Sequence, residues 1–320
     1  MVAGSNLAPA TKPAYICPLI RHTRYPYSVH FSPGTTARLY LVAGAVLWSS
    51  GGFFIKEIDA GATSITFFRC LFAGLLLAPL IRRQRFPLPG DMAVSIVLFA
   101  LLLGLYVGAT KETTAANAIF LQYTAPLYVI AFGPWLLGER LRSREVVPFA
   151  ICICGIAVLF IGNQGSGDLT GMLMGAGSGF FYGLFLLWLR RVRYADPIAI
   201  TFANCMGVAV LFSFALFSRD VDVEDIALLF VMGAVQFALP YLLFTRGLRD
   251  VEASEASLIA LIEPVLNPVW VALFYGEEPS AATVAGGAII LSGLAFRYGV
   301  MREPVRADAA ASVEPPHPGV

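Results

Sequence analysis

Two charged residues of the sequence lie well inside apolar stretches, Arg69 and Glu263. A charge at membrane depth is costly and commonly functional. Pro264 follows Glu263 and lacks an N–H, which frees a backbone carbonyl near residue 260. Asn267 lies one helical turn further on the same face as Glu263. A carboxyl, an amide and an interrupted backbone predict a binding site in which Glu263 carries a proton or binds a substrate ammonium. The alternative that Glu263 only locks its helix to a neighbour stays equally open.

Arg69 allows two interpretations. A guanidinium can bind a substrate anion, or it can serve a structural or gating role. The depths of Arg69 and Glu263 along their apolar stretches are similar, at 1.5 Å of rise per helical residue. The sequence does not say whether the two residues pair.

Further polar and aromatic residues occur at comparable depths of other apolar stretches. They are candidates for the lining of a cavity, although interhelical packing would also use them. The candidates are Trp48, Ser49, Gln122, Tyr123 and Tyr182. Pro126 and Pro264 are predicted to kink their helices at a shared depth, which suits hinge motion as well as a static bend.

Catalytic and cofactor motifs are absent from the sequence. The three histidines, His22, His30 and His317, lie near the ends of the chain, so no H-E-x-x-H zinc motif exists. None of the three lysines follows a glycine, which excludes a P-loop. We therefore expect no cofactor, no metal site and no enzymatic activity.

The composition points to a membrane. Of 320 residues, 58% are hydrophobic and 13% are charged, and the mean hydropathy is +0.73. A soluble domain of this size needs more polar residues for its surface. The net charge of +1 gives no electrostatic footprint for a nucleic acid.

Ten apolar stretches are long enough to cross a bilayer, which takes about 20 residues of helix. They predict an all-α integral membrane protein with ten transmembrane helices, at residues 39–57, 62–81, 92–110, 114–137, 146–163, 171–190, 197–217, 226–245, 254–275 and 281–300.

Arginine and lysine predict the orientation. With the N-terminus in the cytoplasm, 18 basic residues fall on the cytoplasmic side and only Lys56, Lys111 and Arg219 on the other. This asymmetry is typical of multi-pass proteins and places both termini in the cytoplasm. Residues 1–37 and 303–320 are predicted to be disordered extensions.

The two halves of the sequence resemble each other. An offset of 138 pairs Ala118 with Ala256 and Pro126 with Pro264, and an offset of 134 pairs Trp48 with Tyr182. Each half, 38–163 and 171–300, then holds five spans, so the second copy enters the membrane from the opposite side. Inverted repeats are typical of secondary transporters.

The repeated segments AANAIFLQYTAPLYV and EASLIALIEPVLNPVW, followed by LLGERL and GEEP, resemble the EamA-type, ten-span group of the drug/metabolite transporter superfamily. The resemblance covers about residues 39–300. It implies movement of small molecules across the bacterial cytoplasmic membrane, often efflux of amino acids or related metabolites, without implying one substrate.

We therefore expect that the protein is embedded in the lipid bilayer and exports a small metabolite, such as an amino acid or its derivative, by alternating access. A proton gradient or the substrate gradient would drive it. Uptake of a vitamin or nucleoside is the main alternative, and a channel or a membrane enzyme is a more distant one. Neither the substrate nor the oligomeric state follows from the sequence.

Three smaller features have simple structural interpretations. Glycines 171, 175, 179 and 183 recur on one helix face and predict close helix packing. The Gly138-Glu139 and Gly276-Glu277 pairs read as turns. Lys111 and the acidic cluster at 220–225 are expected to be solvated charges at loop edges.

Overall fold

The computed structural model describes residues 33–137, 146–163, 168–218, 220–251 and 253–299, and within these ranges every regular element is a helix. Most of the two predicted disordered extensions, and the Gly138-Glu139 turn, lie outside the described residues. The first helix begins at Pro33, which is earlier than the predicted boundary after residue 37. Proline is tolerated in the first turn of a helix, where no intrahelical bond needs its N–H.

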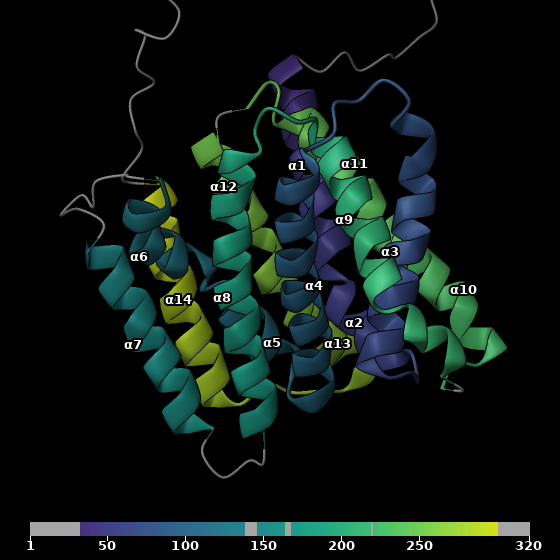
Figure 1. Ribbon diagram of the computed structural model, residues 1–320. Coiled ribbons are helices and arrows are strands. Elements are labelled where there is room, and N and C mark those ends of the chain that lie inside the picture. Colours follow the sequence, from purple (N-terminus) through teal and green to yellow (C-terminus); the bar gives the residue numbers. More distant parts are fainter. Residues whose placement is uncertain (1–32, 138–145, 164–167, 219, 252, 300–320) are drawn as a thin grey trace, which may run out of the picture.

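The helices run antiparallel, alternately up and down one bundle, and α1 begins at the end where α14 finishes (Figure 1). We call this the upper end and the opposite one the lower end. The helices are α1 (Pro33–Ser49), α2 (Gly51–Glu57), α3 (Ala62–Leu77), α4 (Pro89–Glu112), α5 (Ala115–Gln122), α6 (Ala125–Leu137), α7 (Val146–Gly162), α8 (Leu169–Arg191), α9 (Pro197–Leu211), α10 (Val223–Val231), α11 (Leu239–Gly247), α12 (Ala253–Ala260), α13 (Ile262–Tyr275) and α14 (Ala281–Gly299), with short 3₁₀ turns η1 (Ala78–Leu80) and η3 (Ser213–Phe217) and a π-helical segment η4 (Met232–Ala238).

Eight helical stretches among the described residues are long and apolar enough to cross a membrane. Two of the predicted spans correspond instead to shorter apolar helices, Val146–Gly162 and Pro197–Leu211. Each predicted span thus coincides with a helical stretch, but the count of ten crossings stays a prediction.

Four of the long stretches are interrupted near the middle of the bundle. The α-helical conformation is interrupted between α1 and α2, between α5 and α6, and between α12 and α13. Between α10 and α11 the helix widens into the π-helical segment η4. Pro126 and Pro264 lie in the first turns of α6 and α13, just after two of these breaks. Before these prolines the α-helix is interrupted for two residues and for one residue, respectively. The widening at η4 is also notable, since π-helical segments are frequent at functional sites.

The glycine face of α8 packs against α5 and α6, as the spacing predicts. A Cβ built on Gly175 would lie 3.2 Å from Leu121, and one on Gly179 only 2.6 Å from the Thr124 hydroxyl. Gly183 packs in the same way against Ala125 and Tyr128 of α6. The bare backbone of α8 therefore allows the interrupted α5–α6 stretch to approach closely.

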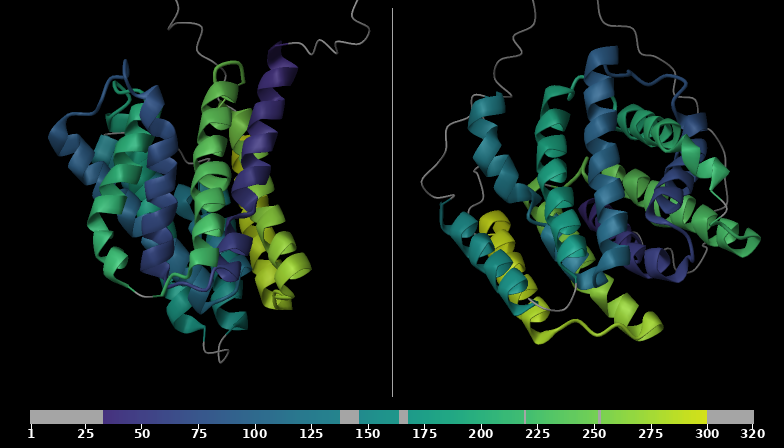
Figure 2. Two further views of the ribbon diagram at one scale, coloured as in Figure 1. Left: turned by 90° about the vertical axis from the view of Figure 1, so that its right-hand side faces the viewer. Right: turned by 60° about the horizontal axis from the view of Figure 1, so that its bottom comes forward.

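Helices distant in the sequence form the rest of the bundle. α7 lies beside α14 and α1 beside α11, whereas α4 packs along α8 in its centre (Figure 2). Buried aliphatic residues at the lower ends of α2, α3 and α5, such as Ile55, Ile65 and Ile119, form the largest apolar core. The packing leaves one polar region in the middle of the bundle, at the level of the helix breaks.

Candidate functional site

A cavity of about 90 Å³ lies in the middle of the bundle. Its walls come from both halves of the sequence and include residues next to all four helix interruptions. The lining residues are Trp48, Gly51, Arg69, Phe99, Leu102, Leu103, Tyr106, Gln122, Tyr123, Tyr182, Phe185, Gln236, Phe237, Tyr241 and Glu263.

Most of the residues singled out in the sequence meet at this cavity. They come from five separate stretches of helix, and they are Trp48, Arg69, Gln122, Tyr123, Tyr182 and Glu263. Ser49 and Asn267 are not among the lining residues. Whether any of these side chains binds a substrate stays a prediction.

Glu263 and Tyr123 connect the two interrupted stretches. The Tyr123 hydroxyl lies 2.8 Å from Oε2 of Glu263 and 3.1 Å from the carbonyl oxygen of Ala260. Ala260 precedes Pro264 by four residues, so its carbonyl is the one that the missing proline N–H leaves free. A hydroxyl from the break between α5 and α6 thus fills the gap in hydrogen bonding at the break between α12 and α13.

Ser49 and Asn267 lie behind the lining and hold it in place. The Ser49 hydroxyl donates to the carbonyl of Val46 at 2.6 Å and accepts from the Trp270 indole at 2.8 Å. Asn267 is fully buried, and its amide nitrogen donates to the hydroxyl of Tyr106, a lining residue, at 3.3 Å. Both contacts join different helices, which is the packing role that the sequence left open.

Arg69 is 4% exposed and contacts an aromatic ring. Its guanidinium carbon lies 4.2 Å from the centre of the Phe237 ring, a cation–π distance. None of the ion pairs among the described residues joins Arg69 to Glu263, although both line the same cavity. The two charges therefore share a site without neutralising each other directly.

Two glutamine side chains complete the polar lining. The amide nitrogen of Gln122 donates to the Ser178 hydroxyl at 3.1 Å. The amide nitrogen of Gln236, in the π-helical segment, donates to the carbonyl oxygen of Trp48 at 3.0 Å. Gly51 allows this second contact, because a Cβ there would lie 2.8 Å from the same nitrogen.

Several lining residues were missed in the sequence, chiefly the aromatic residues of α4, α8 and α11. The signal was present, because the offset of 138 also pairs Phe99 with Phe237 and Leu103 with Tyr241. The rings of Phe99 and Phe237 lie 6.2 Å apart. Extending the repeat offset from 116–156 back to the preceding span would have identified both pairs.

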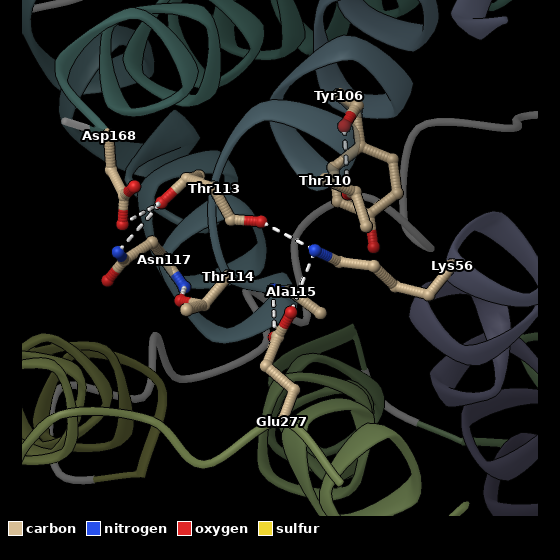
Figure 3. Close-up of polar contacts among 9 residues, drawn as sticks. All are labelled: Lys56, Tyr106, Thr110, Thr113, Thr114, Ala115, Asn117, Asp168 and Glu277. Atoms are coloured by element: carbon tan, nitrogen blue, oxygen red, sulfur yellow. Dashed lines mark hydrogen bonds and ion pairs between the residues drawn. The ribbon is translucent and has the colours of Figure 1, made fainter. Parts of the chain in front are cut away.

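A polar cluster joins several helix ends at the lower end of the bundle (Figure 3). Lys56 at the end of α2 forms an ion pair of 2.7 Å with Glu277 and donates to the carbonyl of Thr113 at 2.9 Å. The other carboxylate oxygen of Glu277 accepts from the backbone N–H of Ala115 at 2.7 Å. The cluster therefore links the ends of α2, α4 and α13 with the start of α5.

Three smaller expectations need correction at this end. Gly276 does form a turn, with a φ of 74°, but the adjacent Glu277 is an interhelical contact. Lys111 donates to the carbonyl of Ile58 at 2.6 Å, and Asp220 accepts from the N–H of Gly61 at 2.8 Å. These charged groups are not simply solvated, because each one forms a hydrogen bond with the backbone of a neighbouring helix end. The sequence does not show which helix ends are neighbours, so these partners could not be predicted.

Comparisons with known proteins agree with this architecture. The model of the EamA-like transporter family matches residues 35–161 and again residues 169–298. An uncharacterized transporter of Archaeoglobus fulgidus is 29% identical, over 81% of this chain and 94% of its own. The pseudopaline exporter CntI of Pseudomonas aeruginosa is 26% identical, over 79% of this chain and 92% of its own.

One solved crystal structure has a similar fold, with a TM-score of 0.59 at 19% identity over 85% of this chain and 98% of that chain. The membrane-length helices and the match to the transporter family model define a multi-pass membrane protein of the transporter class. The chain belongs to the EamA-like transporter family, within the drug/metabolite transporter superfamily.

Proposed function

We propose that the protein exports a small metabolite, an amino acid or a derivative, across a bacterial cytoplasmic membrane by alternating access. The observation that carries this proposal is the cavity between the two halves of the chain, whose lining combines a cation, a carboxyl, amides and aromatic rings. A mixed lining of this kind suits a zwitterion better than a polyanion. Both termini would lie in the cytoplasm.

The mechanism follows from the interrupted helices. The segments 38–163 and 171–300 would form two inverted five-helix repeats in ten spans, with the cavity between them as the shared site. Pro126 and Pro264 would permit α6 and α13 to tilt against α5 and α12. The cluster around Lys56 would close the lower end, which would lie outside if the distribution of basic residues predicts the orientation correctly.

Glu263 would bind the substrate ammonium or carry the coupling proton. The relative named as an exporter of pseudopaline supports outward transport. Uptake remains the alternative, since the direction depends on the driving gradient. A membrane enzyme is disfavoured by the transporter family of the chain.

Counterflow in liposomes tests the proposal. Purified protein is reconstituted with one unlabelled L-amino acid inside, and uptake of the labelled amino acid is followed without any ion gradient. Transient, saturable accumulation is expected for a carrier. Flux that never saturates would indicate a channel, and absence of counterflow for every amino acid would reject this substrate class.

Glu263→Gln, measured over a range of pH, then separates the roles of the carboxyl. Loss of pH-dependent transport with preserved counterflow supports proton coupling, and loss of both supports contact with the substrate. Unchanged transport at every pH would exclude both roles.

A further inference from the structure

Arg69 has hydrogen-bonding capacity that the protein does not use. Its Nε and Nη1 atoms are buried and have no hydrogen-bond partner among the described residues. The π contact with Phe237 offsets only part of the charge. A buried guanidinium without partners is strongly unfavourable, whereas a carboxylate can accept two parallel hydrogen bonds from it.

The acceptors in the cavity are placed on other elements. The contact of the Gln236 amide nitrogen with the Trp48 carbonyl fixes the orientation of the amide, since an oxygen in that place could not donate. The buried Oε1 of Gln236 then has no partner among the described residues. Glu263 adds a carboxyl that receives one hydrogen bond among the described residues, from Tyr123 at 2.8 Å.

The two charged side chains stand on separate walls. Arg69 belongs to α3, which packs against α4, α9 and the π-helical segment, whereas Glu263 belongs to α13, which packs against α1, α2 and α5. A free anion at Arg69 would face the carboxyl of Glu263, and a free cation at Glu263 would leave Arg69 unpaired. A ligand carrying one group of each sign satisfies both walls.

We propose that Arg69 binds the substrate carboxylate while Glu263 receives its ammonium group, so that the cavity selects an α-amino-acid head group in one orientation. This inference rests on the proposed function and specifies the recognition at its site. Arg69 is then the residue that distinguishes an amino acid from its uncharged amide.

The test compares three ligands that differ only in the head group. Thermal shift first identifies the L-amino acid that binds the detergent-purified protein best. Its amide lacks the carboxylate, and its deaminated acid lacks the ammonium. Binding of all three is measured for the wild type, Arg69→Gln, Arg69→Lys and Glu263→Gln. Arg191→Gln is the matched control, because Arg191 is exposed at the end of α8 and pairs with Asp91.

The wild type and Arg191→Gln should prefer the amino acid to both analogues by about thirtyfold or more, the range for losing one partner of a buried charge pair. Arg69→Gln should bind amino acid and amide equally, and Arg69→Lys should recover only part of the preference. Glu263→Gln should lose the preference over the deaminated acid and keep the preference over the amide. The ratio of the dissociation constants of two ligands for the same variant does not depend on the stability of that variant.

A preference for the amino acid over the amide that survives in Arg69→Gln overturns the assignment, even if counterflow still shows amino-acid transport. Equal binding of all three ligands to the wild type also overturns it. If no amino acid binds the wild type or undergoes counterflow, the proposed function fails together with the inference. This result differs from failure of the inference alone, in which amino-acid transport is still observed.

Discussion

Tyr123 shows how one side chain connects two helix interruptions. Its single hydroxyl proton lies within hydrogen-bonding distance of two acceptors, the Ala260 carbonyl and the Glu263 carboxyl, and no other described group donates to that carbonyl. Tyr123→Phe leaves a carbonyl unpaired, which costs about 1–3 kcal/mol in an apolar environment. We expect a lower melting temperature in detergent together with slower counterflow, because the carboxyl loses its positioning donor.

Tyr275→Phe is the matched control for that substitution. Tyr275 lies at the exposed end of the same helix, α13, and is 51% exposed. Its melting temperature and counterflow should equal those of the wild type. Equal values for Tyr123→Phe would show that the hydroxyl is dispensable.

Asp220 gives a prediction about pH. Partial burial favours the neutral form, but hydrogen bonds from Ser218, Gly61 and Ser64 outweigh it and hold the pKa of Asp220 below its ordinary value. A carboxyl whose pKa is lower in the folded state stabilises the protein above its ordinary pKa, about 3.9, and loses that contribution as the pH falls through the folded-state value.

Asp220→Asn should therefore lower the melting temperature by a few degrees at pH 7, and the difference from the wild type should shrink below about pH 4. Melting curves at several pH values provide the measurement. A difference that stays constant down to pH 3 would mean that the charge of Asp220 contributes nothing to stability.

At the scale of elements, the close approach of α8 to α5 and α6 depends on glycine. A methyl group on Gly179 would collide with the Leu121 carbonyl and the Thr124 hydroxyl, both next to the break before α6. Because backbone cannot rotate away as a side chain does, Gly179→Ala should cost about 1–3 kcal/mol of stability. The same displacement should reach Gln122 and Tyr123 in the lining and reduce ligand binding.

Gly90→Ala is the control for this prediction. Gly90 lies in the first turn of α4, and a Cβ there meets nothing within 4 Å. Its melting temperature should be unchanged or slightly raised, since alanine favours helix. If Gly179→Ala melts at the same temperature as Gly90→Ala, the close packing of α8 is not essential.

The sequence predicted the helices well because apolar length is a local property. It also placed Glu263, Arg69 and Tyr123 at similar depths, since depth follows from counting residues along a helix. It did not predict that Ser49 and Asn267 face neighbouring helices, nor that Glu277 reaches Lys56. Those facts depend on the rotation of each helix about its axis and on which helices are neighbours, and one sequence fixes neither.

At the scale of the whole molecule, a polar cluster connects helix ends at the lower end of the bundle. The ion pair between Lys56 and Glu277 joins the two halves of the chain there, and both side chains are largely buried, at 13% and 17% exposure. Backbone contacts to Thr113 and Ala115 extend the cluster to the start of α5. The proposed alternating access would require this cluster to open once in every cycle.

A reversible cross-link at Lys56 and Glu277 tests that requirement. Both residues are replaced by cysteine in a background without the five native cysteines, and a bis-maleimide with a cleavable disulfide joins them. Counterflow should stop on cross-linking and return when the linker is reduced. The two single-cysteine variants, treated with the same reagent, should keep transporting. Full transport by completely cross-linked protein would mean that the substrate does not pass the lower end, and the proposed orientation of the transport path would have to be abandoned.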